Sequence, residues 1–442
     1  MSTCIKVFFL GFLLLGCCSP MLRAQPATTP DRDVSSSTPS EVAKSFNRVT
    51  GTISRKNSLK DLSENRETGR KTLQAALAES KAERSKEAVA PFNLNASYIL
   101  GRAGFMLRNL EAGEYFLKAY VEDAKKLQSP TKLIEGYTAL LIYQYEVGQF
   151  SQCEKTCQEF MDLTLPANAD EDGLINKAKS QILRRLLLCQ ARQGELEKAE
   201  KILKRISGRG GLNPLAEQDL RCRMLREAGK LEEAVSGYQK LIEQVDQDEE
   251  LKKEQRDGIS DELKYTMTGL YTELKQIDKA VSILEVLVAK EPSNSTYNND
   301  LGYIWADNNL NLVKAEKLIR KALEEDKKAK KKAMDDAEPD DDDAQEESDL
   351  NNASYLDSLG WVLFRTNRLD EARKALESAI AVEAGRNLEI YDHLADVLVA
   401  QGDKASAIKY YGLGLESASA SRRDIAKKSQ VEAKLAKLKA AP

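Results

Sequence analysis

Histidine is almost missing from this chain of 442 residues, because His393 is the only one. General bases, catalytic triads and most catalytic metal sites combine a histidine with a second ionisable group at a fixed distance. His393 stands beside Leu394 in a helical pattern of apolar residues, so we expect it at a helix surface or at an interface between helices. The sequence therefore predicts that the protein is not an enzyme.

The chain also lacks a phosphate-binding loop and any strand pattern. Its glycine-rich stretch, Gly208 to Gly211, has neither the strand before it nor the Lys-Ser or Lys-Thr after it that such a loop requires. No segment alternates apolar and polar residues between hairpin turns, as a half-buried strand does. We therefore expect an all-α fold without a cofactor.

Neither the charge nor the aromatic content favours nucleic-acid binding. Lys and Arg number 66 and Asp and Glu 70, so the chain has no excess of basic residues with which to neutralise phosphates. Aromatic residues make up 6% of the chain, which is too few for platforms that stack on bases. The sequence predicts no nucleic-acid partner and mixed charges on the outer faces of helices.

Cysteine is scarce in the body of the chain. Cys153, Cys157, Cys189 and Cys222 fall at interior positions of predicted helices, where a thiol packs like a small apolar side chain. Cys153 and Cys157 are four residues apart, but no histidine or second cysteine pair lies near them in sequence to complete a metal site. We expect no metal site, and the sequence leaves open whether Cys189 and Cys222 form a disulfide.

What the sequence has in abundance is a repeated pair of amphipathic segments. A small residue recurs near the start of each second segment, and three of the seven intervals between these residues are 35 residues long. The recurring residues are Ala112, Cys153, Ala199, Ala234, Ala280, Ala315, Ala372 and Ala407. Apolar residues such as Leu356, Leu359 and Leu363 are spaced by three and four, which places them on one face of a helix. The pattern predicts about eight helix–turn–helix units.

Glycine marks the turns inside these pairs. Gly148, Gly194, Gly229 and Gly402 each stand five residues before the recurring small residue. A left-handed backbone at that place ends a helix, and glycine adopts it without a steric penalty. Asn367 holds the same place in another unit, and asparagine is the usual substitute.

These units resemble tetratricopeptide repeats. The residues that carry the resemblance are Leu301, Gly302 and Tyr303 with Ala315, Ile319 and Ala322; Leu359, Gly360 and Trp361 with Ala372, Leu376 and Ala379; and Leu394, Ala395 and Asp396 with Gly402, Ala407 and Tyr411. The resemblance covers residues 93–421 and implies an α-helical solenoid whose concave groove binds a protein or peptide ligand. Two of the units are similar to repeats of bacterial exported or envelope-associated proteins. In the first unit, Leu100 and Leu107 stand where the family has a small residue and a turn glycine.

Segments on either side of the repeats complete the expected organisation. Residues 41–92 are predicted to form N-terminal helices, and residues 422–442 a C-terminal capping helix with many lysines on its outer face. A charged insertion near residues 327–352 separates the sixth and seventh units. Its lysines, at 327–332, are predicted to extend the preceding helix. Its acidic part has no apolar surface to bury, and a disordered segment is expected there.

The first 24 residues resemble an export signal. Lys6 precedes an apolar run from Val7 to Gly16, which is too short to span a bilayer comfortably. The following Cys17 ends a sequence similar to a bacterial lipobox, which implies that Cys17 is lipidated; ordinary cleavage after Ala24 and an uncleaved anchor are the alternatives. Residues 25–40, rich in Pro, Thr and Ser, are predicted to be a flexible linker. We expect a periplasmic protein or an outer-membrane lipoprotein with an N-terminal lipid tether, or alternatively a secreted protein.

Candidate partner-binding residues lie on the first helices of the units, which face the groove in the geometry of the family. These residues are Arg184, Arg223, Tyr265, Asn299, Tyr303, Asp357, Trp361 and Phe364. Aromatic and polar side chains of this kind hold an extended peptide or a helix, although packing within the array is a competing interpretation for Tyr303 and Trp361.

Two hypotheses of function follow from this sequence. The first is a non-enzymatic interaction scaffold in the bacterial envelope that binds a protein or peptide ligand in the groove. The alternative is an oligomerising structural or assembly component of an envelope export or surface-polysaccharide machine. The sequence does not indicate the oligomeric state.

Overall fold

The computed structural model describes residues 66–84, 93–164, 174–208, 212–335 and 350–440. Within these ranges the chain forms 18 α-helices and one short 3-10 helix, and it forms no strand. The expectation of an all-α fold is confirmed.

Several predicted segments lie outside the described residues. They are the export signal at 1–24, with Cys17, the linker at 25–40, the first part of the N-terminal helical segment at 41–65, and the acidic stretch at 336–349.

Sixteen of the helices form eight consecutive pairs. In chain order these are α4 (Leu94–Met106) with α5 (Leu110–Leu127), α6 (Pro130–Glu146) with α7 (Phe150–Met161), α8 (Leu174–Arg192) with α9 (Leu196–Ser207), α10 (Pro214–Glu227) with α11 (Leu231–Gln247), α12 (Lys253–Glu273) with α13 (Ile277–Lys290), α14 (Ser295–Asp307) with α15 (Leu312–Asp335), α16 (Ala353–Arg365) with α17 (Leu369–Ala381), and α18 (Leu388–Ala400) with α19 (Lys404–Ser417). α3 (Arg66–Arg84) precedes the pairs and α20 (Arg422–Ala440) follows them, while the 3-10 helix η2 covers Glu383–Gly385.

The turns inside the pairs share one backbone geometry. The four predicted turn glycines have a left-handed backbone, with φ between 79° and 81°, and these are Gly148, Gly194, Gly229 and Gly402. Asn367 also has the predicted left-handed conformation, and Lys275 adopts it in the fifth pair. After Gly148, the N–H of Gln149 donates to the carbonyl oxygen of Gln144 at 2.8 Å, which is the long bond of a Schellman motif. Each first helix therefore ends at a fixed place.

The first pair has its turn one residue later than the sequence pattern predicts. The left-handed residue is Arg108, with φ of 56°, and not Leu107. Gly113, five residues further on, therefore holds the place of the small residue that was expected at Ala112. Ala112 and Gly113 are both small, so only the length of the turn distinguishes the two registers.

The same shift applies to the first helix of that pair, where Gly101 rather than Leu100 is the small residue. A Cβ built on Gly101 would lie 2.7 Å from Cγ of Leu117. A Cβ built on Gly360, which holds this place in the seventh pair, would lie 2.5 Å from Cγ of Leu376. Neither gap leaves room for a side chain, so glycine at this position allows the two helices of a pair to approach closely.

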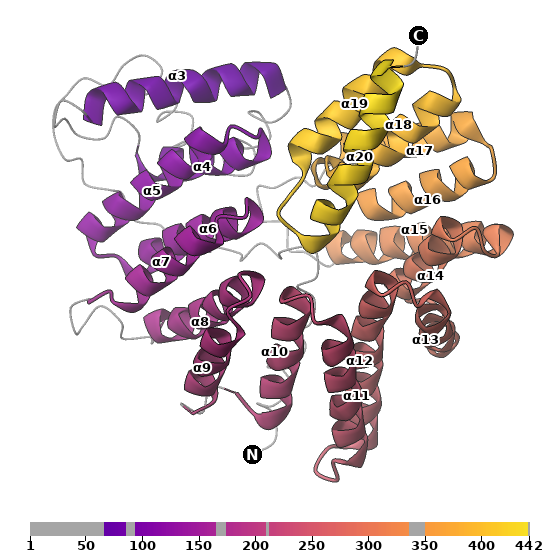
Figure 1. Cartoon of the computed structure of the whole chain (residues 1–442), viewed down its shortest axis with the longest axis horizontal. Coiled ribbons are helices and arrows are strands. Elements are labelled where there is room, and N and C mark those ends of the chain that lie inside the picture. The colour runs from indigo at the N-terminus through magenta and orange to yellow at the C-terminus, as the bar shows by residue number, and fades with distance from the viewer. Residues whose placement is uncertain (1–65, 85–92, 165–173, 209–211, 336–349, 441–442) are drawn as a thin grey trace.

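The array curves because its first helices pack on one another. Neighbouring first helices such as α6 and α8, or α14 and α16, contact each other directly, whereas the described second helices of adjacent pairs make no comparable contact. The first helices therefore form the inner, concave side, which we call the inner face. Figure 1 shows the pairs following one another around a nearly complete circle, with α3 and α19 at neighbouring positions.

Apolar side chains fill the space between successive pairs. The buried residues form three clusters, of which the first joins α3 to the first pair and the second runs from α5 to α10. The third cluster extends from α10 to Val431 in α20. Because α20 buries Val431 against the last pair, this helix covers the apolar end of the array.

Candidate functional site

Three inner helices carry Lys, Arg, Asp and Glu residues of a single sign, α8 in the first half of the array and α14 and α18 in the second. α8 has five basic residues and no acidic one. α18 has three acidic residues and α14 has two, and neither helix contains a lysine or arginine. Fixed charges of opposite sign on one concave surface attract and orient a ligand whose own charge is unevenly distributed.

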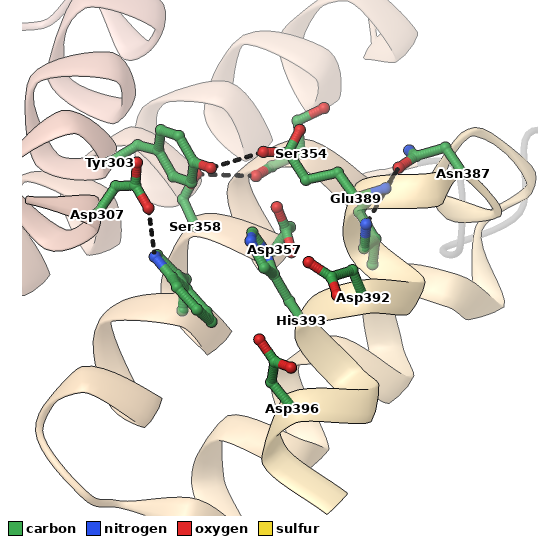
Figure 2. Close-up of polar contacts among 12 residues, drawn as sticks. Tyr303, Asp307, Ser354, Asp357, Ser358, Asn387, Glu389, Asp392, His393 and Asp396 are labelled. Atoms are coloured by element: carbon green, nitrogen blue, oxygen red, sulfur yellow. Dashed lines mark hydrogen bonds and ion pairs between the residues drawn. The ribbon is translucent and has the colours of Figure 1, made fainter. Parts of the chain in front are cut away.

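A buried polar and aromatic cluster joins α14, α16 and α18 (Figure 2). His393, 1% exposed, contacts Oδ1 of Asp357 through Nδ1 at 2.8 Å. Its ring stacks on Trp361 with the ring centres 4.1 Å apart, and the indole N–H of Trp361 donates to Asp307 at 3.3 Å. The cluster fixes three neighbouring inner helices in one arrangement. His393 thus lies at an interface between helices, one of the two places that the sequence predicts for it.

Tyr303 connects the sixth pair directly to the eighth. Its hydroxyl donates to Glu389 at 2.6 Å, and Glu389 also pairs with Arg423 of α20. Burial raises the pKa of Glu389, but the positive charges of Arg423 and Lys427 and the hydrogen bond from Tyr303 outweigh it and leave that pKa well below its ordinary value. Burial raises the pKa of Tyr303 well above its ordinary value. Glu389 is therefore a stable anion that accepts a hydrogen bond from a neutral phenol.

Basic residues of α20 neutralise the rest of the acidic surface on α18. Asp392, 1% exposed at its side chain, pairs with Lys427 at 3.0 Å and with Lys434 at 2.8 Å. Lys434 also pairs with Asp396 at 2.7 Å. α20 thus acts as a basic helix bound to an acidic one.

A second polar cluster lies between α12 and α14. The hydroxyl of Tyr265 donates to Asp300 at 2.7 Å, and the side-chain amide of Asn299 donates to the same carboxylate at 3.1 Å. Burial raises the pKa of Asp300 above its ordinary value, although both hydrogen bonds act in the opposite direction. The ring of Tyr297 packs 5.2 Å from that of Tyr265.

Arg184 of α8 and Arg223 of α10 lie close together on the inner face. Burial lowers the pKa of Arg184, and the neighbouring charge of Arg223 lowers it further, although Asp219 acts in the opposite direction. Arg223 pairs with Asp219 at 2.9 Å, and the hydroxyl of Tyr238 donates to that same carboxylate at 3.2 Å. Half-buried guanidinium groups of this kind can bind a carboxylate through two parallel hydrogen bonds.

The predicted binding residues divide into two sets by exposure. Asn299, Asp357 and Trp361 are 5%, 6% and 8% exposed, so they hold neighbouring helices together. The remaining five are half-buried, namely Arg184, Arg223, Tyr265, Tyr303 and Phe364. For Trp361 the structure therefore gives a packing role within the array, while Tyr303 combines such a role with partial exposure.

Four acidic residues of the inner face are missing from the predicted set. They are Asp300, Glu389, Asp392 and Asp396. The sequence contains a signal for three of them, because Glu389, Asp392 and Asp396 are spaced by three and four in a helix without lysine or arginine. An ordinary solvated helix face mixes both charges, so this one-sided pattern indicates a basic neighbour.

Metal-binding groups, cysteines and apolar helices were the remaining features to locate among the described residues. They contain no group of three or more His, Cys, Asp or Glu arranged to hold a metal ion. Cys189 and Cys222 are free thiols in separate hydrophobic clusters, and Cys153 and Cys157 are also free and buried. Among the described helices, none is both long enough and apolar enough to cross a bilayer.

Comparison with known proteins finds a family model that matches the last two helix pairs. Residues 358–421 match the family model of the tetratricopeptide repeat. A thermophilic tetratricopeptide-repeat protein of Thermus thermophilus is 18% identical, with 51% of this chain and 98% of that chain covered and a TM-score of 0.35. A tetratricopeptide-repeat protein of Parabacteroides merdae is 15% identical, with 57% and 98% covered and a TM-score of 0.32. A search among curated proteins finds no match to this chain.

Proposed function

Because the chain carries tetratricopeptide repeats, we propose that it is a non-enzymatic scaffold that binds a protein partner on its inner face. The observation that carries the proposal is a set of half-buried arginine and aromatic side chains on the inner helices, namely Arg184, Arg223, Tyr265, Tyr303 and Phe364. The fold itself needs small residues between the helices of a pair, and it does not need arginines or aromatic rings that stay half-exposed on its inner side. These side chains therefore offer a surface to a ligand.

The ligand that suits this face is a protein segment with separated charges. Its acidic part contacts Arg184 and Arg223, and its basic or aromatic part contacts the half-buried rings of Tyr265, Tyr303 and Phe364. Half-buried arginines and aromatic rings are the residues that supply most of the free energy at protein interfaces. Partner contact at the buried Asp357 and Trp361 is not part of the proposal.

Capture of the partner tests this function. A tagged full-length chain is cross-linked in cells, and the partners are identified by mass spectrometry. The affinity of the leading partner is then measured for wild type and for Arg184→Glu. We expect the variant to bind about tenfold more weakly, the loss that follows from removing one well-placed charged contact.

A matched control lies on the same helix. Lys177 of α8 is exposed, so Lys177→Glu changes the net charge equally without altering the half-buried arginine pair. Equal affinities of wild type and Arg184→Glu for every captured partner would contradict binding on the basic part of the inner face. Equal losses of affinity in both variants would show that the change in net charge, and not a contact with Arg184, weakens binding.

We also propose that the scaffold works in the bacterial envelope, either as a lipoprotein anchored through Cys17 or as a protein released by cleavage after Ala24. The support is the sequence pattern at residues 1–24. Mass spectrometry of the mature N-terminus distinguishes the two forms, because a diacylglycerol on Cys17 adds a lipid mass. An unprocessed N-terminus on a cytoplasmic protein would contradict export.

A further inference from the structure

The segment between α19 and α20 lies against the opposite end of the array. Its amide at Ala420 donates to the carbonyl oxygen of Glu146, at the end of α6, at 2.8 Å. The guanidinium groups of Arg108 and Arg192 donate to the carbonyl oxygens of Ser417 and Ala420, which are 309 and 228 residues away in the sequence. In Figure 1 the start of α20 points toward the centre of the circle, near the ends of α6, α8 and α10.

These contacts recognise the backbone of the segment and not its side chains. One N–H and two carbonyl groups of the segment are bonded, and charge-assisted hydrogen bonds from guanidinium groups are among the stronger ones in proteins. Small side chains make this approach feasible: a Cβ built on Gly148 would lie 3.0 Å from Cβ of Ala420. The turn glycine therefore leaves space for the segment as well as ending a helix.

Side-chain contacts hold both ends of the segment. Glu416 pairs with Arg70 of α3 at 2.7 Å. At the other end, the guanidinium group of Arg422 packs over the turn of the fourth pair, where a Cβ built on Gly229 would lie 2.8 Å from its nearest nitrogen. Contacts thus come from α3 and from the ends of α4, α6, α8 and α10.

The receiving surface is ordered by its own packing. The guanidinium group of Arg108 lies over the ring of Phe105 at 4.9 Å, and that of Arg192 over Phe150 at 5.2 Å. The side chain of Arg192 is 6% exposed and lies 3.7 Å from Glu227. Held in this way, the donors lose little conformational entropy when they bind a carbonyl group.

Hydrogen bonds within the segment also order it. The N–H of Ser419 donates to Asp424 at 2.7 Å, and the N–H of Asp424 donates to the hydroxyl of Ser421 at 3.0 Å, as an N-cap of α20 does. These local bonds keep the carbonyl of Ala420 free for Arg192.

We propose that the ends of α4, α6, α8 and α10 form a binding surface for a short non-helical segment of small residues, and that residues 418–421 of this chain, with Glu416 and Arg422 on either side, occupy it and close the array into a ring. Arg184 and Arg223, which the proposed function invokes, are not among the contacts of this surface. An external protein that presents a similar extended segment competes for the same surface and opens the ring.

Hydrogen exchange in the full-length chain measures the closure directly. In wild type the amide of Ala420 is protected by its bond to Glu146. The double variant Arg108→Gln, Arg192→Gln removes two donors, and we expect exchange at Ala420 to be at least about tenfold faster, since one charge-assisted hydrogen bond contributes about that factor. The radius of gyration from X-ray scattering should increase.

The control for this variant removes two exposed arginines of outer helices. Arg320 of α15 pairs with Glu316, and Arg373 of α17 pairs with Glu377 and, at 4.0 Å, with Asp403. None of these residues contacts the segment, so Arg320→Gln with Arg373→Gln should leave exchange at Ala420 unchanged. An amide at Ala420 that exchanges equally fast in wild type and in the Arg108, Arg192 variant would overturn the proposal.

A second variant opens the ring from the side of the segment and leaves the receiving surface intact. Ala420→Leu places a larger side chain against Gly148, so it should raise exchange and scattering radius, whereas Ala426→Leu, at an exposed position of α20, should not. A fluorescent peptide with the sequence of residues 416–423 should then bind Ala420→Leu at least about tenfold more tightly than wild type, whose surface is occupied. Equal peptide binding by the two proteins would overturn the proposal.

Discussion

Helices α8 and α18 hold the same position in their helix pairs, yet their charged residues differ completely in sign. α8 contains five basic residues and no acidic one, and α18 contains three acidic residues and neither lysine nor arginine. Both helices bury the same kind of apolar stripe against their neighbours, including Leu187 in α8 and Leu394 in α18. The repeat thus specifies the buried positions of an inner helix and leaves its polar positions open to selection by function.

The two helices also differ in how their charges are satisfied. The carboxylates of α18 have partners inside the chain, in Arg423, Lys427 and Lys434 of α20. On α8, Arg192 pairs with Glu227, and Arg184 lies beside Arg223, which itself pairs with Asp219. The charges of α18 are thus balanced by a helix of opposite sign, whereas those of α8 lie beside α10, which carries both signs.

The largest expected effect concerns the property that the two halves share. Gly101 and Gly360 face Leu117 and Leu376 at distances that exclude a side chain, so Gly101→Val and Gly360→Val should each lower the free energy of unfolding by about 3 kcal/mol. Urea denaturation measures both. In Gly258→Ala, on α12, the added Cβ meets no atom within 4 Å, and this variant should be slightly stabilised. Unequal losses at Gly101 and Gly360 would break the equivalence of the two halves.

The next effect is specific to the acidic half. Asp392→Ala leaves Lys427 without its buried partner and Lys434 with Asp396 alone, and because Lys427 regains some water, we expect a loss of about 2 kcal/mol in unfolding free energy. Asp370→Ala, at an exposed position of α17, should change stability by less than about 0.5 kcal/mol. Equal unfolding free energies of the two variants in chemical denaturation would show that the contact between α18 and α20 stabilises the fold no more than an exposed surface residue does.

A double-mutant cycle measures a single ion pair between α18 and α20 and compares it with an ion pair on the outer surface. The cycle on Asp396 and Lys434 should give a coupling of about 1 kcal/mol, because Asp396 is largely buried and is also held by Tyr411. The exposed pair Arg373 and Glu377 should give about 0.3 kcal/mol. Similar coupling in both cycles would show that the inner contact behaves as a surface ion pair.

The smallest effect separates two acids within the acidic half by pH. Glu389 has a depressed pKa in the folded state, so its stabilising contribution is present above its unfolded pKa and is lost as pH falls toward the folded value. Asp300 has a raised pKa, so its contribution is present below its unfolded pKa and is lost as pH rises through the folded value. Glu389→Gln should therefore flatten the acid side of the stability profile, and Asp300→Asn the side toward neutral pH. Unfolding curves at a series of pH values test both signs.

Local chemistry explains which parts of this fold can be predicted from the sequence. A left-handed turn residue has a strong signature in glycine or asparagine, and Gly148, Gly402 and Asn367 were predictable for that reason. Arg108 and Lys275 adopt the same backbone without such a signature, because the packing of the helices on either side imposes it. The register of the first pair was therefore wrong by one residue.

Contacts between distant segments were beyond such reasoning. The charge pattern of α18 indicates a basic neighbour, but nothing in the sequence identifies Lys427 and Lys434 as that neighbour. The contacts of the segment around Ala420 are even harder to predict from the sequence. They use backbone atoms of the segment, and every residue has the same backbone. The burial of Asp357 and Trp361 also depends on how closely successive inner helices approach.

The contact between Glu146 and Ala420 also changes how the array should come apart. In a linear solenoid each terminal pair has one neighbour, so fraying starts at the ends and moves inward. When the last pair rests on the first four, neither end is terminal in this sense. We therefore expect the closed molecule to unfold in one cooperative step. A variant that lacks the contact between the two ends of the array should instead lose its terminal helix pairs one after another.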